Sequence, residues 1–504
     1  MKLNTLAQVI SFGLCAQIVS VAGLNEARSL ERRKTSILFN PQGLPQLPGL
    51  QEATNASRQV GLNLDDVQGD ILIGMRKLFE RFFFFGILNA PDFKAKLKTE
   101  ILPLVTSTMQ VIANETDTML NIAFSQTGLV ALNITGPTND LNDAVFAKGQ
   151  AMDAFNLGDP NTTNWVPEFV GTNIHGVMLL ASDTEASINT TLADLQSKLG
   201  NSITEIYSLR TAMRPNENRG HEHFGFLDGI SNPTVGGFQD PLPGQALVPT
   251  GEILVGETGD SVTRPEWAKD GSFLVFRQLK QLVPEFNKFL ADNPINEPGL
   301  TPEQGSELLG ARMVGRWKSG APVFLSPKFD DPDLGKDPTR NNNFTFAEPG
   351  QNISDPTDQS GCPFSAHIRK TRPRADIGLP ENVTSNHHIV RAGIPYGPEV
   401  TTDETSSNTT EIERGLAFVA YQSNIANGFQ FLQHFWANNP KFVHQGVGFD
   451  PIIGANASAE RPVNGLDPTN TTRNFTLTTD FVVSRGGEYF FSPSISAIAN
   501  TLSV

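Results

Sequence analysis

The chain has 504 residues, a formal net charge of -15 and a pI near 5.0. This length suits two domains or one large bilobed unit. Nucleic-acid binding needs a basic surface, so the acidic balance argues against it. The apolar fraction of 38% is ordinary for a globular protein and allows a core with a sizeable internal cavity.

The first 22 residues have the pattern of a secretory signal peptide. Lys2 supplies a positive start, residues 6–22 are largely apolar, and small residues follow. A membrane anchor is the alternative, but the run is short for a membrane span and polar residues interrupt it. Residues 23–60 are expected to form a propeptide or flexible lead. We therefore expect a secreted, extracellular protein without a membrane anchor.

Cysteine usage and glycosylation sequons agree with export. Cys15 lies in the expected signal peptide, which leaves Cys362 alone and rules out an intramolecular disulfide in the mature chain. About a dozen N-x-S/T sequons are spread along the chain. Any one of them arises easily by accident, but together with a signal peptide they favour a glycoprotein. Examples are Asn55, Asn114, Asn161, Asn343, Asn408 and Asn474.

In chain order, the first half contains several segments with the composition of buried strands. β-branched and aromatic runs of this length favour strands over helices. The expected strands are residues 81–86, the start of 119–134 (continuing as a helix), 174–182 and 202–213.

The second half repeats this alternation of strands and helices. Strands are expected at residues 271–279 and 415–424, and helices at 283–293, from 301 onward, and at 427–440. Two long polar stretches, residues 330–361 and 399–413, are expected to be surface loops, since long loops in compact domains are functional or mobile. The repeated pattern indicates two duplicated α+β lobes.

The segment HEHFGFLDGISNP, residues 221–233, carries the clearest chemical signal. Asp228 lies between Gly225 and Gly229 in an apolar setting, where an ionised carboxylate is costly to desolvate. Such a group is suited to take up and release a proton. A strand that ends in a turn capped by Asp228 explains the same residues equally well.

This segment resembles the signature of the dye-decolorizing (DyP-type) haem peroxidases, and two later blocks resemble the same family. The resemblance implies that Asp228 is the distal acid–base, and residues 362–374 (CPFSAHIRKTRPR) imply that His367 is the iron ligand. Residues 387–397 (HHIVRAGIPYG) imply that Arg391 is the distal cation. Some members carry an asparagine two positions after this arginine, where this chain has Gly393.

The resemblance also implies a fold. The expected class is α+β, with two ferredoxin-like domains built from antiparallel sheets and helices, and with haem held mainly by the C-terminal domain. The expected domains are residues 61–265, which carry the GFLDG motif, and residues 266–504. By resemblance, the first strand of the fold begins in residues 64–72.

Further site residues are weaker expectations. Asp450 resembles the carboxylate that accepts the N–H of the proximal histidine, although a turn aspartate before proline is the alternative. Arg369 is expected to pair with a haem propionate. Tyr396 and Trp436 match positions where fungal relatives carry surface aromatic residues for electron transfer, although core packing explains Trp436 equally well.

Several other residues leave their roles open. Arg312 and Arg316 either reach the haem edge or form a solvated or salt-bridged face. The histidine pairs at positions 221 and 223 and at positions 387 and 388 raise a copper or zinc site as a disfavoured alternative.

The expected function is that of a secreted haem peroxidase with one haem b per chain. It would use hydrogen peroxide to oxidise dyes, phenols and other aromatic compounds, including lignin-related ones. The alternative is a haem-binding or iron-handling protein of the same fold with little turnover. No nucleic acid and no protein partner is expected.

Overall fold

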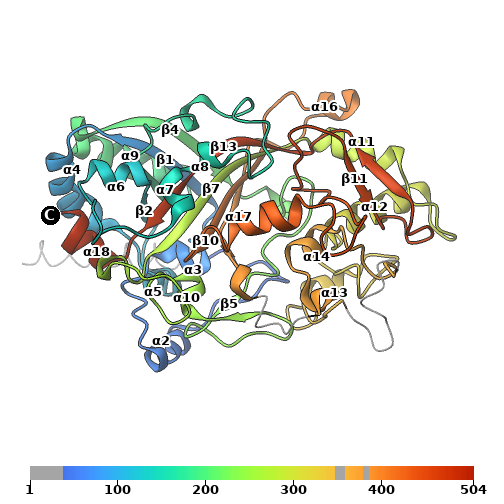
Figure 1. The fold of residues 1–504 in the computed structure, drawn as a ribbon, viewed down its shortest axis with the longest axis horizontal. Helices are drawn as coiled ribbons and strands as arrows, with labels where there is room; N and C mark the ends of the chain where they lie inside the picture. The colour runs from blue at the N-terminus through green and yellow to red at the C-terminus, as the bar shows by residue number, and fades with distance from the viewer. Residues whose placement is uncertain (1–37, 347–357, 379–384) are drawn as a thin grey trace, which may run out of the picture.

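The computed structural model describes residues 38–346, 358–378 and 385–504 (Figure 1). The expected signal peptide lies outside these residues. Within them, nine strands form one antiparallel sheet in the order β4-β1-β3-β2-β13-β7-β10-β8, with β9 paired to β10. The strands of the first half are β1 (Phe79–Ile87), β2 (Thr118–Phe124), β3 (Gly176–Ser182) and β4 (Ile203–Ala212). Those of the second half are β7 (Ser272–Gln281), β8 (Val390–Arg391), β9 (Ile394–Tyr396), β10 (Gly415–Gln422) and β13 (Val482–Ser492).

Both halves of the sheet follow the same strand order. In each half the last strand lies beside the first, the first beside the third, and the third beside the second, as the orders β4-β1-β3-β2 and β13-β7-β10-β8 show. This is the ferredoxin-like arrangement, so the predicted α+β class with two ferredoxin-like units is confirmed. The two halves join where β2 and β13 meet, at the pair Phe124 and Phe491. The exact domain limits stay a prediction.

The sheet is buried on both faces. Along β1, Phe82 and Phe84 enter one hydrophobic core and Phe83 and Phe85 enter the other. Successive side chains of a strand point to opposite faces, so a continuous apolar run is what a doubly covered strand requires. This explains the four consecutive phenylalanines that the sequence placed in a strand.

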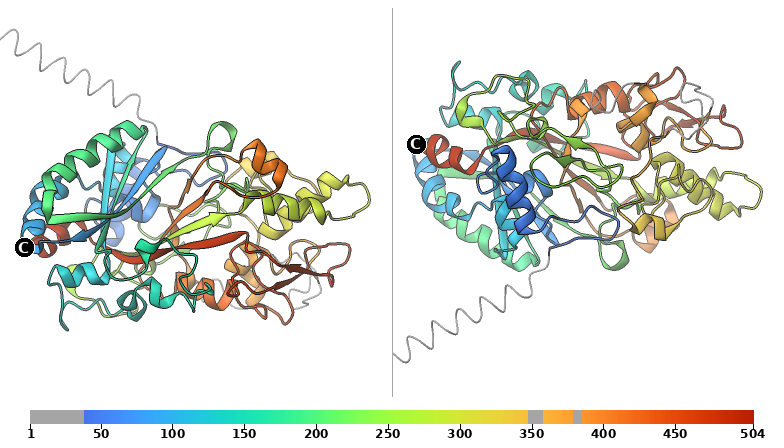
Figure 2. Two further views of the ribbon diagram at one scale, coloured as in Figure 1. Left: turned by 90° about the horizontal axis from the view of Figure 1, so that it is seen from above. Right: turned by 90° about the horizontal axis from the view of Figure 1, so that it is seen from below.

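Helices cover both faces of the first half (Figure 2). Residues of α4 and α9 belong to one core, and residues of α2, α3 and α5 belong to the other. The bounds are α2 (Leu50–Val60), α3 (Gly69–Ile73), α4 (Ala90–Lys96), α5 (Thr108–Ala113), α6 (Gln126–Ala131), α7 (Ala144–Lys148), α8 (Gln150–Asp153), α9 (Glu185–Leu199) and α10 (Thr250–Ile253).

The helices of the second half surround the end of the sheet that holds the candidate site (Figure 1). They are α11 (Val283–Asp292), α12 (Pro302–Val314), α13 (Pro332–Lys336), α14 (His367–Thr371), α16 (Thr402–Ser407) and α17 (Phe429–Phe431), which continues as the π-helix η9 (Leu432–Ala437). Two small sheets pair β5 (Thr234–Val235) with β6 (Leu247–Val248) and β11 (Arg461–Asn464) with β12 (Asn474–Leu477).

The C-terminal segment returns to the first half. Helix α18 (Ile495–Ala497) and the following π-helix η10 (Ile498–Leu502) lie at the end of the molecule where α4 is found (Figure 1). Lys94 on α4 donates a hydrogen bond to the backbone oxygen of Val504 at 2.7 Å. The two halves are therefore interlocked by the chain end. No helix in the described ranges combines the length and apolar character needed to span a bilayer.

Three expectations about local structure need correction. Residues 64–72 do not start a strand, because they lead into α3, where the backbone N–H of Asp70 donates to Asn121 Oδ1 and its carboxylate accepts from Met75 N. Part of the expected flexible lead is folded, since α2 occupies residues 50–60 and buries Ala53. The polar stretches are not structureless loops, because they contain α13 and α16.

Candidate active site

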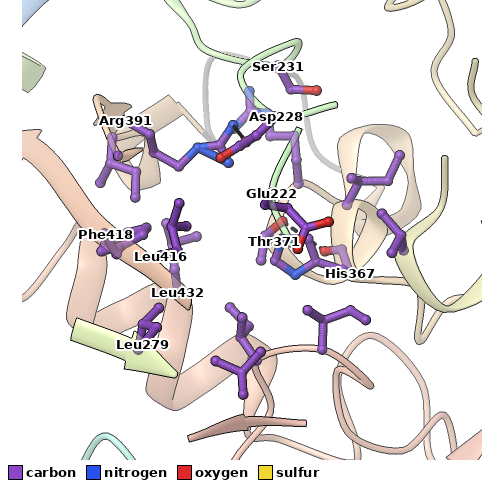
Figure 3. Close-up of a pocket in the computed structure, with 18 of the residues that line it drawn as sticks. Glu222, Asp228, Ser231, Leu279, His367, Thr371, Arg391, Leu416, Phe418 and Leu432 are labelled. Atoms are coloured by element: carbon purple, nitrogen blue, oxygen red, sulfur yellow. Dashed lines mark hydrogen bonds and ion pairs between the residues drawn. The ribbon is translucent and has the colours of Figure 1, made fainter. Parts of the chain in front are cut away.

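A cavity of about 270 Å³ lies against one face of the second half of the sheet. One wall is apolar, and Figure 3 shows its side chains grouped on one side of the cavity: Leu279 from β7, Leu416 and Phe418 from β10, and Leu432 from η9. The other walls come from α14 and from the segment 222–233. An apolar cavity with a few convergent polar groups is the usual form of a ligand or cofactor site.

Asp228 reaches this cavity at the end of a tight hairpin. His221 and Leu227 form an antiparallel bridge, and Asp228 N donates to Gly220 O at 3.3 Å. At the hairpin's tip, Gly225 has a φ of 98°, which glycine tolerates far better than residues with a side chain. The hairpin therefore explains why the motif places a glycine three residues before the carboxylate.

Arg391 lies beside Asp228 in the same cavity. Its Nη2 atom is 3.2 Å from Asp228 Oδ1, and 27% and 37% of the two side chains, respectively, are exposed (Figure 3). The Asn232 side chain fixes the arginine backbone, donating to Arg391 O at 2.9 Å and accepting from Arg391 N at 3.2 Å. A carboxylate and a guanidinium held this way can handle a proton and a developing negative charge together.

Gly393, two positions after the arginine, also lines the cavity. A Cβ atom at this position would lie 2.9 Å from Ala417 O on the paired strand β10. Such a contact requires the backbone to shift, so the close approach of β10 favours glycine here.

His367 faces the cavity from the first turn of α14, with its Nδ1 atom 2.8 Å from Asp450 Oδ2 (Figure 3). Asp450 is fully buried, and its other oxygen accepts the N–H groups of Ile452 and Ile453. A carboxylate bonded to Nδ1 fixes the tautomer and the ring orientation, so that Nε2 is left for a ligand in the cavity. The interpretation of Asp450 as a turn aspartate also agrees with the structure, because Oδ1 bonds to the turn amides and Oδ2 bonds to His367.

Arg369 does not line the cavity. Its guanidinium pairs with Asp376 at 2.6 and 2.8 Å, and it stacks 3.9 Å above the ring of Phe364. Both charged side chains are almost fully buried. The expected pairing with a propionate is therefore corrected: two residues along a helix, the side chain points away from the face that His367 presents.

Tyr396 and Trp436 are not surface residues, because each side chain is only 5% exposed. Trp436 stacks on Phe442 with ring centroids 5.0 Å apart and lies edge-on to His387 at 5.3 Å. Tyr396 donates its hydroxyl hydrogen to Glu413 at 3.0 Å. Burial on an apolar helix and beside β10 explains why position in the sequence gave the wrong exposure.

Arg312 and Arg316, whose roles the sequence left open, have different surroundings. Arg312 is fully buried and donates to four backbone carbonyls, so it is neither at the cavity nor on a solvated face. Arg316 does line the cavity, where it donates to Ser231 Oγ and Asn342 Oδ1 at 3.0 Å.

The histidine pairs do not assemble a metal site in the described part of the chain. No group of three or more potential His, Cys, Asp or Glu ligands is found there. His223 is buried and bonds through Nε2 to Tyr396 O at 2.9 Å, and burial lowers its pKa to about 4. His387 stacks on Phe431, and His388 contacts Glu252 at 3.1 Å.

The cavity residues that sequence reasoning missed include two arginines and a glutamate. Arg372 and Arg374 line the cavity and add positive charge to its wall. Glu222, inside the same motif as Asp228, also lines the cavity and holds the hairpin from within. The run of basic residues after His367 was the available signal for the arginines. Glu222 gave no distinct signal, because a glutamate in a polar turn has no special pattern.

Two family models together cover most of the chain. The model described as the DyP dimeric alpha+beta barrel domain matches residues 66–215, and the model described as Dyp-type peroxidase, C-terminal, matches residues 220–442. The second match includes the Asp228, His367 and Arg391 blocks.

Known proteins match over nearly the full length. Peroxidase 2 of Mycetinis scorodonius is 58% identical, with 94% of each chain covered. The dye-decolorizing peroxidase AauDyP1 of Auricularia auricula-judae is 51% identical, covering 97% of this chain and 96% of that protein. A solved structure of a dye-decolorizing peroxidase, with a heme pocket engineered for asymmetric sulfoxidation, matches with a TM-score of 0.85 and 53% identity. It covers 88% of this chain and 100% of its own.

Proposed function

The chain belongs to the dye-decolorizing (DyP-type) peroxidases, and we propose that it is a secreted haem peroxidase in which Asp228 and Arg391 act on hydrogen peroxide while His367 holds the iron. The observation that carries these residue roles is that the Asp228–Arg391 pair and the His367–Asp450 pair serve one apolar cavity. Peroxide chemistry at a haem is helped by a proton carrier and a stabilising cation, and imidazole is the usual axial ligand in peroxidases.

The cavity residues fit one haem b per chain. Nδ1 of His367 is engaged by Asp450, so Nε2 is the atom available to iron. The apolar wall suits the macrocycle, and Arg316, Arg372 and Arg374 in the lining supply positive charge for its two carboxylates. When bound, the haem would take the two oxidising equivalents of peroxide and return them to reducing substrates.

Asp228 is the proton carrier in this proposal. It takes the proton from one peroxide oxygen and delivers it to the other, which leaves as water. Arg391, always charged and 3.2 Å from Asp228, offsets negative charge on the departing oxygen. Because the carrier is a carboxylate, we expect activity to be highest at acidic pH.

The proposed reducing substrates are dyes, phenols and other aromatic compounds, including lignin-related ones. Tyr396 and Trp436 stay candidates for electron transfer, now as buried relays between the cavity and the surface. Trp436 touches His387, which lines the cavity. Secretion rests on the N-terminal sequence pattern and on the sequons.

The second candidate function is haem binding or iron handling with little turnover. It requires the same cavity and His367, but it does not explain why Asp228 and Arg391 are paired there. The near full-length similarity to named peroxidases also favours the enzyme.

The test is the absorption spectrum of the purified protein before and after one equivalent of peroxide. Wild type is compared with Asp228→Asn, Arg391→Leu and His367→Ala. The two distal variants should keep the haem band but react with peroxide about 100-fold more slowly or worse. The His367 variant should lose haem. A haem band that does not respond to peroxide would support haem binding, and a protein that takes up no haem would refute both functions.

A further inference from the structure

Glu222 holds the Asp228 hairpin together from inside. Its Oε2 atom accepts the backbone N–H of Phe224 at 2.8 Å, and its Oε1 atom accepts that of Phe226 at 2.8 Å. Its own backbone N–H donates to Phe226 O at 3.0 Å, which closes the loop. The Glu222 carboxylate therefore accepts hydrogen bonds from two of the four backbone amides at residues 223–226.

The same carboxylate ties the hairpin to the sheet. The side-chain amide of Gln281, at the end of β7, donates to Glu222 Oε2, and its oxygen accepts from His223 N at 3.4 Å. Residues of β7 line the cavity, so this link sets where the hairpin lies relative to the cavity wall. Arg214 adds a hydrogen bond from Nη1 to Glu222 O at 2.6 Å.

We propose that Glu222 is a positioning residue for Asp228, which holds the hairpin at β7 so that the Asp228 carboxylate stays beside Arg391. This inference rests on the proposed role of Asp228. Three N–H groups donate to the two carboxylate oxygens, an arrangement that favours the ionised form of Glu222, which accepts hydrogen bonds only. A displacement of about 1 Å at a proton carrier is enough to slow catalysis substantially.

The Asp228 carboxylate also affects the ionisation of Glu222. Burial raises the pKa of Glu222, the amides of Phe226 and Phe224 and Gln281 oppose this, and the nearby Asp228 carboxylate raises it further. Two like charges disfavour each other's ionisation. Other ionisable groups near the hairpin include Arg214, Lys318 and the two histidines of the motif, and burial lowers the pKa of both His221 and His223. The two histidines are mainly neutral above their lowered pKa values, so they offset little of the repulsion between the Glu222 and Asp228 carboxylates.

The test substitution is Glu222→Gln, which keeps the shape and removes the charge. Whichever way the new amide turns, its NH2 group faces one of the two backbone N–H groups, so one hydrogen bond is lost. The matched control is Glu217→Gln, which neutralises an exposed glutamate five residues earlier.

The first readout does not depend on turnover. Hydrogen exchange of the amides at Phe224 and Phe226 should be faster in Glu222→Gln and unchanged in Glu217→Gln. The second readout is the rate of reaction with peroxide, which should fall by about 10- to 100-fold. Haem content and the KM for a reducing dye should stay the same.

The Asp228→Asn variant distinguishes a failure of the positioning role of Glu222 from a failure of the proposed function. If Asp228→Asn slows the peroxide reaction but Glu222→Gln reacts with peroxide as fast as the control, the positioning role is refuted while the proposed function stands. If Asp228→Asn leaves the rate unchanged, the proposed function itself fails. Should Glu222→Gln not fold, Gln281→Leu leaves both hairpin amides bonded to Glu222 while it removes the donor to Oε2 and the acceptor for His223 N, and it should give a smaller change in the same direction.

Discussion

Two carboxylates at the site, Asp228 and Asp450, differ in what surrounds them. Asp228 keeps 37% of its side chain exposed and has Arg391 as its charged partner. Asp450 is fully buried, and its two oxygens bond to His367 and to two backbone amides. A carboxylate that must exchange protons needs access to the cavity, whereas one that orients a histidine needs rigidity. The burial difference therefore matches the two roles.

The Asp450 contact gives a prediction about cofactor affinity. Replacing Asp450 by alanine removes the acceptor for His367 Nδ1, so the ring loses its fixed tautomer and orientation. Loss of such an outer partner typically lowers metal affinity about 10- to 100-fold. Haem titration of the apoprotein should show this loss for Asp450→Ala and a smaller one for Asp450→Asn, which can still accept a hydrogen bond. Equal affinity in wild type and Asp450→Ala would contradict the role.

At the residue level, the resemblance identified the charged groups that meet at the cavity. Asp228, Arg391 and His367, which short motifs carry, line one cavity, and Asp450 bonds to His367 behind it; their roles stay a proposal. It failed for Arg369, because the helix at residues 367–371 was not predicted, and two residues along that helix the side chain points away from the face of His367. It also missed Glu222, whose part depends on amides that turn inward only in the folded hairpin.

The segment 399–413 shows how an element can be hidden in polar sequence. It was predicted as a surface loop, yet Glu404 of α16 is fully buried and pairs with buried Arg414 at 2.6 Å. The same carboxylate accepts from Thr401, Glu411 and Ile412. The Glu404 carboxylate therefore bonds to the Arg414 guanidinium and to three backbone amides inside the protein, in a segment whose sequence looks solvated. Only the folded arrangement reveals this, because a buried pair has no pattern of its own in the chain.

Removal of Glu404 should therefore destabilise the second half. Glu404→Ala leaves the Arg414 charge buried without its partner, which typically costs about 3–5 kcal/mol. Chemical unfolding monitored by circular dichroism measures the loss. Asp403→Ala, an exposed neighbour in the same helical turn, is the control and should change stability by no more than about 0.5 kcal/mol. Similar small effects for both variants would show that the pair contributes little.

Strands were predicted better than their partners across the sheet. The runs containing residues 81–86, 174–182 and 271–279 are strands because apolar runs of this length fit a sheet that is covered on both faces. The junction of the two halves through β2 and β13 could not be predicted, since one residue pair links strands more than 350 positions apart. Periodicity describes a strand and says nothing of its neighbour.

Across the whole molecule, several buried or half-buried acids favour the protonated form. Burial raises the pKa of Asp70 to about 6 and that of Glu488 to about 7, and burial together with Glu257 raises that of Asp270 to about 7. Asp70 also accepts the Tyr421 hydroxyl at 2.7 Å, which joins α3 of the first half to β10 of the second. An enzyme proposed to work in acid thus has cores that tolerate acid.

These shifts fix the sign of the pH dependence of stability. In the unfolded chain the same carboxyls ionise near their ordinary pKa values of 3.8 and 4.5. Between those values and about 6 or 7, the folded state binds more protons than the unfolded state, so stability falls as pH rises through this window. Glu404 acts in the opposite sense: Arg414 holds its pKa far below the usual range, and its contribution is lost as pH drops below about 4.5.

Glu488 is the clearest test of this balance. Glu488→Gln cannot ionise, so it should remove the part of the destabilisation that wild type acquires between about pH 5 and pH 8, on the order of 3 kcal/mol. Unfolding free energies at several pH values should then fall less steeply for Glu488→Gln than for wild type, while Glu460→Gln, at an exposed position, should follow wild type. A slope as steep as that of wild type would mean that Glu488 ionises in the folded protein without cost. The higher stability expected at acidic pH would then have to come from Asp70 and Asp270.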